Sequence, residues 1–124
     1  MKTMRPKFVP KPWGWELWIA HTPKYTGKIL FIKKGGRLSR QYHRWKDETI
    51  HVDSGVLSME VNGRTRPLKK GTSIRVRPGT IHRMSAEKGP VRLIETSTSQ
   101  VLDVVRLSDD YGRVERPHTR RRPQ

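Results

Sequence analysis

Three residues of types that bind metal ions lie close together in the middle of the chain. Gln41 and His43 are two positions apart, so on an extended strand their side chains point to the same side. Glu48 has the opposite parity, but a turn across residues 44–47 would re-phase the chain and direct its carboxylate to that side as well. His51 has the opposite parity to Glu48, and we expect it to face outward.

A fourth candidate ligand lies much further along the chain. The segment Pro78-Gly79-Thr80-Ile81-His82 predicts a turn that delivers His82 at the start of a strand. Two imidazoles, an amide oxygen and a carboxylate form a nitrogen and oxygen ligand set that suits Zn²⁺, Mn²⁺, Fe²⁺, Co²⁺ or Ni²⁺, and Cu²⁺ is also compatible. Spacing alone leaves two interpretations open. The four residues bind one divalent ion, or they are ordinary polar residues of strand ends and turns.

The elements that must position these residues are strands. Short apolar-alternating segments recur between Gly, Pro, Asn and Asp residues, and helical periodicity is nearly absent, which is typical of all-β proteins. We expect eight to ten strands, among them 28–34, 49–53, 56–61, 64–68, 73–77, 81–85 and 91–96. Trp13, Trp15, Leu17 and Ile19 are expected to share one face of a first strand. Asn62-Gly63 predicts a type I′ hairpin turn.

The length of 124 residues predicts a single domain. Hydrophobic residues make up 32% of the chain and charged residues 31%, so the core must be small, and a β-barrel suits this composition because it closes its own edges. We expect a basic N-terminal arm over 1–10, a barrel over 11–113 and a basic, disordered tail over 114–124. A homodimer is also expected, since a short chain with few hydrophobic residues gains from burying a sheet face against a second copy.

The net charge of +16 is spread over the ends and the body of the chain. Residues 12–112 carry eighteen basic and ten acidic residues, so the body alone is +8, which favours an anionic partner such as a phosphate or an acidic sugar, or serves solubility alone. No nucleic-acid-binding motif appears, so that role is not expected. The absence of cysteine excludes disulfides and thiolate metal sites. No apolar run predicts a membrane span or a secretory signal, and a cytoplasmic location is expected.

The order of the candidate ligands resembles a known pair of motifs. Gln-x-His-x4-Glu-x6-Gly, preceded by Gly35 or Gly36 and ending at Gly55, and Pro-Gly-x2-His, ending at His82, resemble the two motifs of the cupin superfamily. The resemblance implies a single-domain cupin, an antiparallel jelly-roll β-barrel. More narrowly, the chain is similar to the cupin domain of the type II mannose-6-phosphate isomerase group. The matching segments are Lys11-Pro12-Trp13-Gly14, Gly36-Arg37-Leu38-Ser39, Ile81-His82-Arg83, Ile94-Glu95, Val105-Arg106 and Asp109-Asp110-Tyr111-Gly112-Arg113.

This resemblance assigns roles to individual residues. Gln41, His43, Glu48 and His82 take the metal-ligand positions, and glutamine in the first of them favours isomerases over iron dioxygenases, which commonly have a third histidine there. The activity implied is the interconversion of an aldose and a ketose phosphate. The candidate catalytic residues are Glu48, Lys46 and Glu95. Position near these motifs, and not the resemblance, gives the candidate substrate-binding residues: the cations Arg37, Arg83 and Arg106, for the phosphate, and the aromatic residues Tyr42 and Trp45, for a sugar ring. Trp45 is alternatively a packing lid.

Two other functions fit the same residues. A copper- or iron-loaded site would make the protein an oxidoreductase that oxidises a carbohydrate or a small aromatic compound. A non-catalytic cupin would bind a sugar without turning it over. The identity of the metal separates the isomerase from the oxidoreductase, because redox-inert zinc excludes oxygen chemistry.

Overall fold

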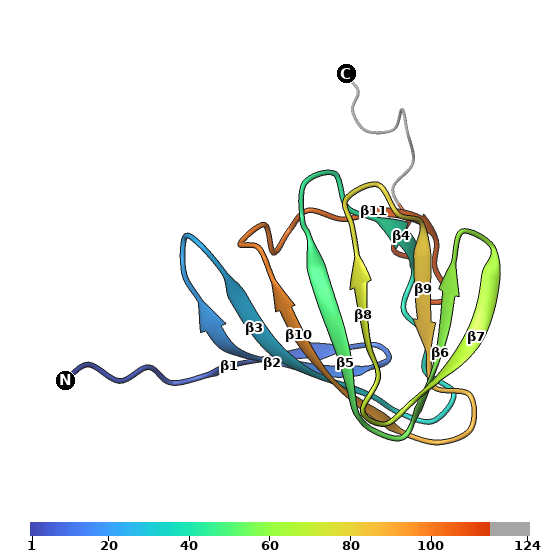
Figure 1. Cartoon of the computed structure of the whole chain (residues 1–124), viewed down its shortest axis with the longest axis horizontal. Helices are drawn as coiled ribbons and strands as arrows, with labels where there is room; N and C mark the ends of the chain where they lie inside the picture. Colours follow the sequence, from blue (N-terminus) through green and yellow to red (C-terminus); the bar gives the residue numbers. More distant parts are fainter. Residues whose placement is uncertain (115–124) are drawn as a thin grey trace.

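Two antiparallel sheets curve around a common interior in the computed structural model, which describes residues 1–114 (Figure 1). The first sheet has the order β1 (Lys7–Lys11), β2 (Gly14–His21), β3 (Thr26–Ile32), β10 (Val91–Ser97), β5 (Glu48–Ser54) and β8 (Ser73–Val76). The second has the order β11 (Val105–Ser108), β4 (Arg40–Tyr42), β9 (His82–Ser85), β6 (Val56–Val61) and β7 (Arg64–Lys69). The predicted all-β, antiparallel jelly-roll fold is confirmed. Eleven strands lie in the described residues, against the eight to ten expected.

The core lies between the sheets and follows from strict alternation along the strands. In β3, Leu30 and Ile32 point inward, and the same alternation directs Lys28 inward as well. In β5 and β10 it places Glu48 and Glu95 on the inner face beside apolar neighbours. A side-chain period of two therefore carries three charged residues into the interior. The apolar core comprises Trp13, Leu30, Ile32, Leu38, Ile50, Val52, Leu57, Met59, Leu68, Val76, Met84, Ala86, Val91 and Leu93.

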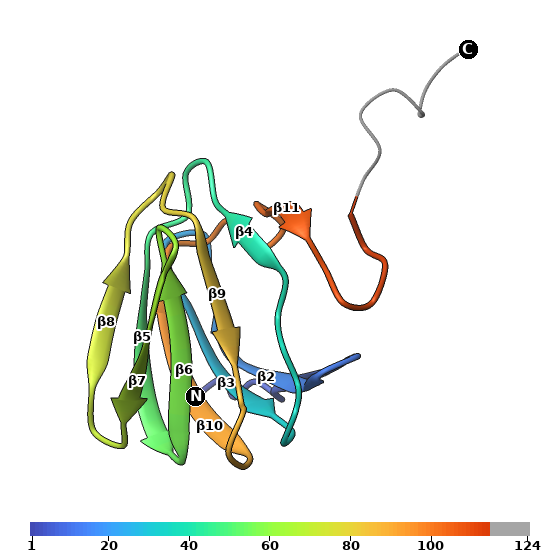
Figure 2. The same cartoon turned by 90° about the vertical axis from the view of Figure 1, so that its right-hand side faces the viewer.

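The turns bring the ends of distant strands together. Asn62 and Gly63 have φ angles of 49° and 84°, and a type I′ turn requires positive φ at both positions. The loop that follows β4 and the loop that precedes β9 lie side by side at one end of the barrel (Figure 2), where the amide of Gly79 donates a hydrogen bond to the carbonyl of His43. The candidate ligands of both motifs therefore meet at this end.

The first strand differs from the expectation in one respect. Trp13 lies in the turn between β1 and β2 and is buried in the core, whereas Trp15 and Ile19 lie on the outer face of β2. The predicted common face is wrong because the turn breaks the alternation at Gly14, where a Cβ would collide with the carbonyl oxygen of Phe31. The inward positions of β2 therefore include Glu16.

Replacing Trp13 with alanine should destabilise the fold by about 3–5 kcal/mol, because a large and almost fully buried side chain is removed from the core. Urea unfolding followed by circular dichroism measures the effect. Trp45→Ala is the matched control, since this side chain is 66% exposed and its loss should change stability by about 0.5 kcal/mol or less. An equal loss in both variants would contradict the assignment of Trp13 to the core.

The N-terminal segment contributes a strand to the first sheet. Strand β1 pairs with β2, so the first sheet begins within the segment expected to be an arm. Residues 115–124, which make up nearly all of the predicted tail, lie outside the described residues. Among the described residues, no helix is long and apolar enough to cross a membrane.

Candidate metal centre

Three of the four predicted ligands form one buried cluster. His43 follows β4, Glu48 begins β5 and His82 begins β9, and one ligand atom from each lies within 4.8 Å of the other two. All three residues are at most 3% exposed, and the two imidazole rings have centroids 5.2 Å apart. Strands that are distant in the sequence thus bring two imidazoles and a carboxylate together inside the barrel.

Backbone carbonyls fix the orientation of both imidazole rings. Nδ1 of His43 lies 2.6 Å from the carbonyl oxygen of Asp103, and Nδ1 of His82 lies 2.9 Å from that of Thr80. A carbonyl oxygen can only accept a hydrogen bond, so we assign the proton of each neutral ring to Nδ1. The Nε2 atom of each ring then presents a lone pair to the interior. This arrangement is typical of metal-binding histidines, whose other nitrogen is held by a carbonyl or carboxylate.

The two lone pairs point at the same carboxylate. Oε2 of Glu48 lies 3.3 Å from Nε2 of His43 and 3.4 Å from Nε2 of His82. Three electron-rich atoms thus converge in a buried place, and Nε2 of His82 has no hydrogen-bond donor there. Two atoms that each bind a tetrahedral zinc ion at about 2.1 Å lie about 3.4 Å apart, so these separations fit a divalent metal ion. The cluster could hold one.

The fourth predicted ligand lies beside the cluster. Gln41 of β4 is paired directly with His82 of β9, so both side chains are on the same face of the second sheet. The amide oxygen of Gln41 accepts a hydrogen bond of 2.8 Å from the hydroxyl of Ser39. Gln41 faces the same cavity as His43 and Glu48, and its role as a ligand stays a prediction.

Glu48 also belongs to a buried ion-pair chain with the two other predicted catalytic residues. The ammonium of Lys46 lies 3.2 Å from Oε1 of Glu48 and 3.0 Å from Oε2 of Glu95. Burial favours a raised pKa for Glu48, but its surroundings, among them the charge of Lys46, hold the pKa well below its ordinary value. Burial favours a lowered pKa for Lys46, but the two carboxylates raise it above its ordinary value. Glu48 and Lys46 therefore stay charged, and Lys46 is enclosed between two acidic side chains.

Asp103 holds this site together and was missed by the sequence analysis. Its carboxylate accepts hydrogen bonds from the backbone amides of Arg44, Trp45 and Lys46 at 2.7–3.0 Å, while its carbonyl accepts the bond from His43. Burial opposes ionisation of Asp103, but these amides lower its pKa. One residue thus fixes the predicted turn across 44–47, which aims Glu48 inward, and orients His43. Nothing in the spacing of the ligands indicates an acid 55 positions after Glu48.

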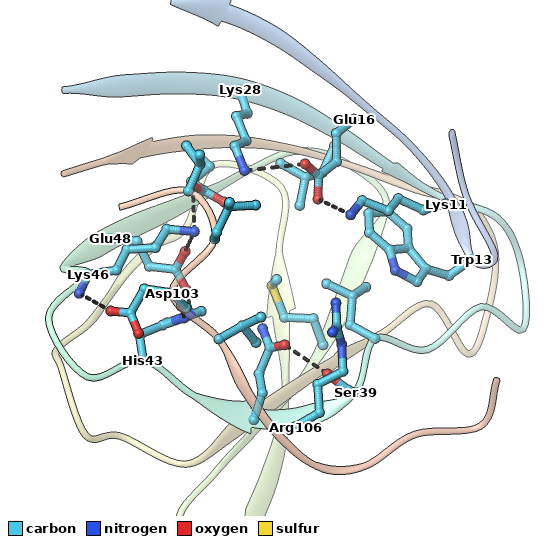
Figure 3. Close-up of a pocket in the computed structure, with 18 of the residues that line it drawn as sticks. Lys11, Trp13, Glu16, Lys28, Ser39, His43, Lys46, Glu48, Asp103 and Arg106 are labelled. Carbon is cyan, nitrogen blue, oxygen red and sulfur yellow. Dashed lines mark hydrogen bonds and ion pairs between the residues drawn. The ribbon is translucent and has the colours of Figure 1, made fainter. Parts of the chain in front are cut away.

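The cluster opens into a cavity whose opposite wall is also charged. Figure 3 shows His43, Glu48 and Asp103 on one side of it, and Lys11, Glu16 and Lys28 on another. Glu16 accepts hydrogen bonds from Trp18 (2.9 Å) and Lys28 (3.3 Å), and its second oxygen lies 4.0 Å from Lys11. Sequence analysis also missed Glu16, although its alternation with Trp15 and Leu17 was a signal. The cavity therefore has a polar cluster on each of two walls.

The predicted substrate-binding residues are divided between two places. Arg106 lines the cavity. Arg37 and Arg83 do not line it, and both form ion pairs with Asp110, at 3.0 and 2.8 Å. Arg83 follows His82 directly on β9 and therefore points to the other face of the second sheet. Tyr42 is half-buried and Trp45 is 66% exposed, and neither lines the cavity.

A family model described as the cupin domain matches residues 28–97, a range that contains His43, Glu48 and His82. The chain is a cupin. It is 34% identical over 110 residues to the mannose-1-phosphate guanylyltransferase ManC of Salmonella typhimurium, an alignment that covers 86% of this chain and 23% of ManC. This cupin spans about a quarter of the length of the curated relatives it matches. The predicted resemblance to the cupin region of this protein group is confirmed.

Solved structures share the fold at low sequence identity. KdgF from a Halomonas species has a TM-score of 0.69 at 20% identity, covering 75% of this cupin and 86% of KdgF. A sugar phosphate isomerase of the cupin superfamily from Silicibacter pomeroyi has a TM-score of 0.59 at 16% identity, covering 67% of this cupin and 59% of that chain. These similarities show the jelly-roll fold alone.

Proposed function

We propose that this cupin is a metal-dependent enzyme that interconverts an aldose phosphate and a ketose phosphate, of the mannose 6-phosphate type. The observation that carries the proposal is the convergence of two imidazole lone pairs and a carboxylate oxygen next to a cavity with a cationic wall. Several matched relatives are named mannose-1-phosphate guanylyltransferases, and one structural neighbour is named a sugar phosphate isomerase, which supports a phosphorylated sugar as the substrate.

Four cations that line the cavity supply a place for the phosphate. Lys11, Lys28, Arg106 and Arg113 all line the cavity. Burial lowers the pKa of Lys11; Glu16 opposes this effect, but the charges of Lys28, Arg106 and Arg113 lower it further. A bound dianion would relieve this repulsion between cations. We therefore propose Arg106, with Lys11 and Arg113, as the phosphate-binding group, because these cations line the cavity, Arg113 while paired with Asp109 at 2.9 Å. Arg37 and Arg83 do not line it.

His43, Glu48 and His82 would hold the metal ion, with Gln41 as the fourth protein ligand. A divalent ion bound there supplies a Lewis acid that polarises a substrate oxygen. Lys46 offsets the charge of Glu48 and Glu95 and keeps both carboxylates in place. Zn²⁺, Mn²⁺, Fe²⁺, Co²⁺ and Ni²⁺ suit the ligand set, and Cu²⁺ is compatible.

The proposed function predicts about one divalent ion per chain and isomerisation of mannose 6-phosphate that falls more than about 100-fold on chelation and returns when the metal is restored. Elemental analysis of protein purified without added metal, followed by a coupled isomerase assay and an oxygen electrode on the same sample, measures both. Stoichiometric copper or iron with oxygen uptake and no isomerisation would establish the oxidoreductase instead. Sugar binding that is unaffected by chelation, without turnover, would establish a non-catalytic cupin.

A homodimer is part of the proposal. The outer face of β1–β3 carries an aromatic row in which Trp15 stacks on Phe31 (centroids 5.5 Å apart) and contacts Phe8 (5.9 Å). Phe8 and Ile19 on this face are 58% and 46% exposed. A second copy packed there would bury them, as in many symmetric dimers.

A further inference from the structure

The cavity offers four carboxylates in the described part of the chain, and two of them, Glu48 and Asp103, have contacts at both oxygens. Glu48 faces both imidazoles and Lys46. Glu95 binds Lys46 and the hydroxyl of Ser97, both through Oε2, on the wall that carries the His43, Glu48 and His82 cluster. The carboxylate of Asp103 accepts three backbone amides. The fourth, Glu16, is held through one oxygen, Oε1, by Trp18 and Lys28, while Oε2 has a distant contact of 4.0 Å with Lys11.

Glu16 is also rigidly placed. Its side chain is 8% exposed, and its partner Lys28 is 4% exposed. The Lys28 ammonium lies between Oε1 of Glu16 and the Trp18 ring, whose centroid is 4.7 Å away, so it has little freedom to move. Trp18 of β2 and Lys28 of β3, which are cross-strand neighbours, thus hold Oε1 of Glu16 and leave Oε2 directed to the cavity. In Figure 3 this carboxylate lies across the open centre from His43.

We infer that Glu16 is the base that moves the carbon-bound proton in the proposed isomerisation. Oε2 takes the proton from C2 of the aldose; the C–H electron pair forms the C1=C2 bond, and the carbonyl pair moves onto O1. The O2 proton shifts to O1 within this enediolate. Glu16 then returns its proton to C1 as the C2=O bond forms, so the ketose leaves and the carboxylate is regenerated. The inference rests on the proposed function and adds a residue outside the predicted catalytic set of Glu48, Lys46 and Glu95.

The charge state of Glu16 suits this role. Burial favours the neutral acid, but the charge of Lys28, the Trp18 hydrogen bond and the charge of Lys11 lower the pKa of Glu16 below its ordinary value. The group therefore meets the substrate as a carboxylate, ready to accept a proton. Lys28 acts as a positioning residue through Glu16.

Glu16→Gln tests the assignment, because the amide keeps a hydrogen-bond acceptor for Lys28 but is not a base. We expect kcat to fall about 10²–10⁴-fold. Metal content and the Kd for inorganic phosphate, by calorimetry, should stay within about threefold. In D₂O the wild-type protein should place deuterium on the sugar carbon, and the variant should not. Glu60→Gln is the matched control: this acid is likewise ion-paired, with Arg40 at 2.9 Å, but it does not line the cavity.

The outcomes are distinguishable. A Glu16→Gln variant that isomerises within threefold of the wild type, or that loses the metal together with activity, overturns the assignment and leaves the proposed function standing. If Glu16→Gln does not fold, Glu16→Asp replaces it: a base set back by one methylene should keep deuterium incorporation at a reduced rate, and full activity would overturn the inference. Failure of the wild-type protein to isomerise any sugar phosphate overturns the proposed function and this assignment together.

Discussion

Replacing both His43 and His82 with alanine is expected to weaken binding of the divalent ion by at least about 100-fold and to remove the activity that depends on it. Loss of a group that only supports a metal ligand costs about 10–100-fold, and here two ligands are lost. The remaining Glu48 would keep its ion pair with Lys46 but would have no imidazole beside it. Competition with a chromophoric chelator measures the affinity.

The control for this experiment is a third histidine of the same barrel. His51 lies on β5 and bonds the Ser73 hydroxyl on the outer face, as its parity predicted, so His51→Ala should leave metal affinity within about twofold. The single variants His43→Ala and His82→Ala complete a double-mutant cycle. The sum of their losses in metal-binding free energy should exceed the loss in the double variant, because both histidines bind one ion. Unchanged metal content in the double variant would contradict the assignment of His43 and His82 as metal ligands.

The ligand cluster could be predicted because it depends on local rules. A period of two places Gln41 on the same side of β4 as its neighbour His43, and a turn across 44–47 re-phases Glu48. Pro78-Gly79 then delivers His82 from the other sheet. Each of these steps involves a few consecutive residues. The resemblance to the cupin motifs then indicated that the two segments meet inside one barrel.

The residues that were missed depend on contacts that local rules do not describe. Glu16 points inward because the turn at Gly14 shifts the face of β2, so Trp13 and Trp15 do not share a side. Asp103 reaches the loop before β5 from a segment of irregular structure after β10. Arg83 was expected at the substrate because it follows a ligand, but that adjacency on a strand places it on the opposite face.

Asp103→Ala is expected to weaken metal binding by about 10–100-fold without removing any ligand. The variant keeps the backbone carbonyl that orients His43, but the amides of Arg44, Trp45 and Lys46 lose their acceptor, so the turn that aims Glu48 is no longer fixed. The free energy of unfolding should fall by about 1–3 kcal/mol, because a charged acceptor of several hydrogen bonds is removed. Metal titration and urea unfolding on the same preparations separate the two effects.

Asp53→Ala provides the matched control, since this acid forms an exposed ion pair with Arg92 at 2.8 Å, away from the cavity, and such pairs contribute about 0–1 kcal/mol. Asp103→Asn should lie between the wild type and Asp103→Ala, because its amide offers one acceptor oxygen where the carboxylate offers two. If Asp103→Ala loses stability but binds the ion as tightly as the wild type, the loop geometry does not control the metal ligands. If affinity falls in the order wild type, asparagine, alanine, the turn across 44–47 is the element through which this barrel sets the position of Glu48.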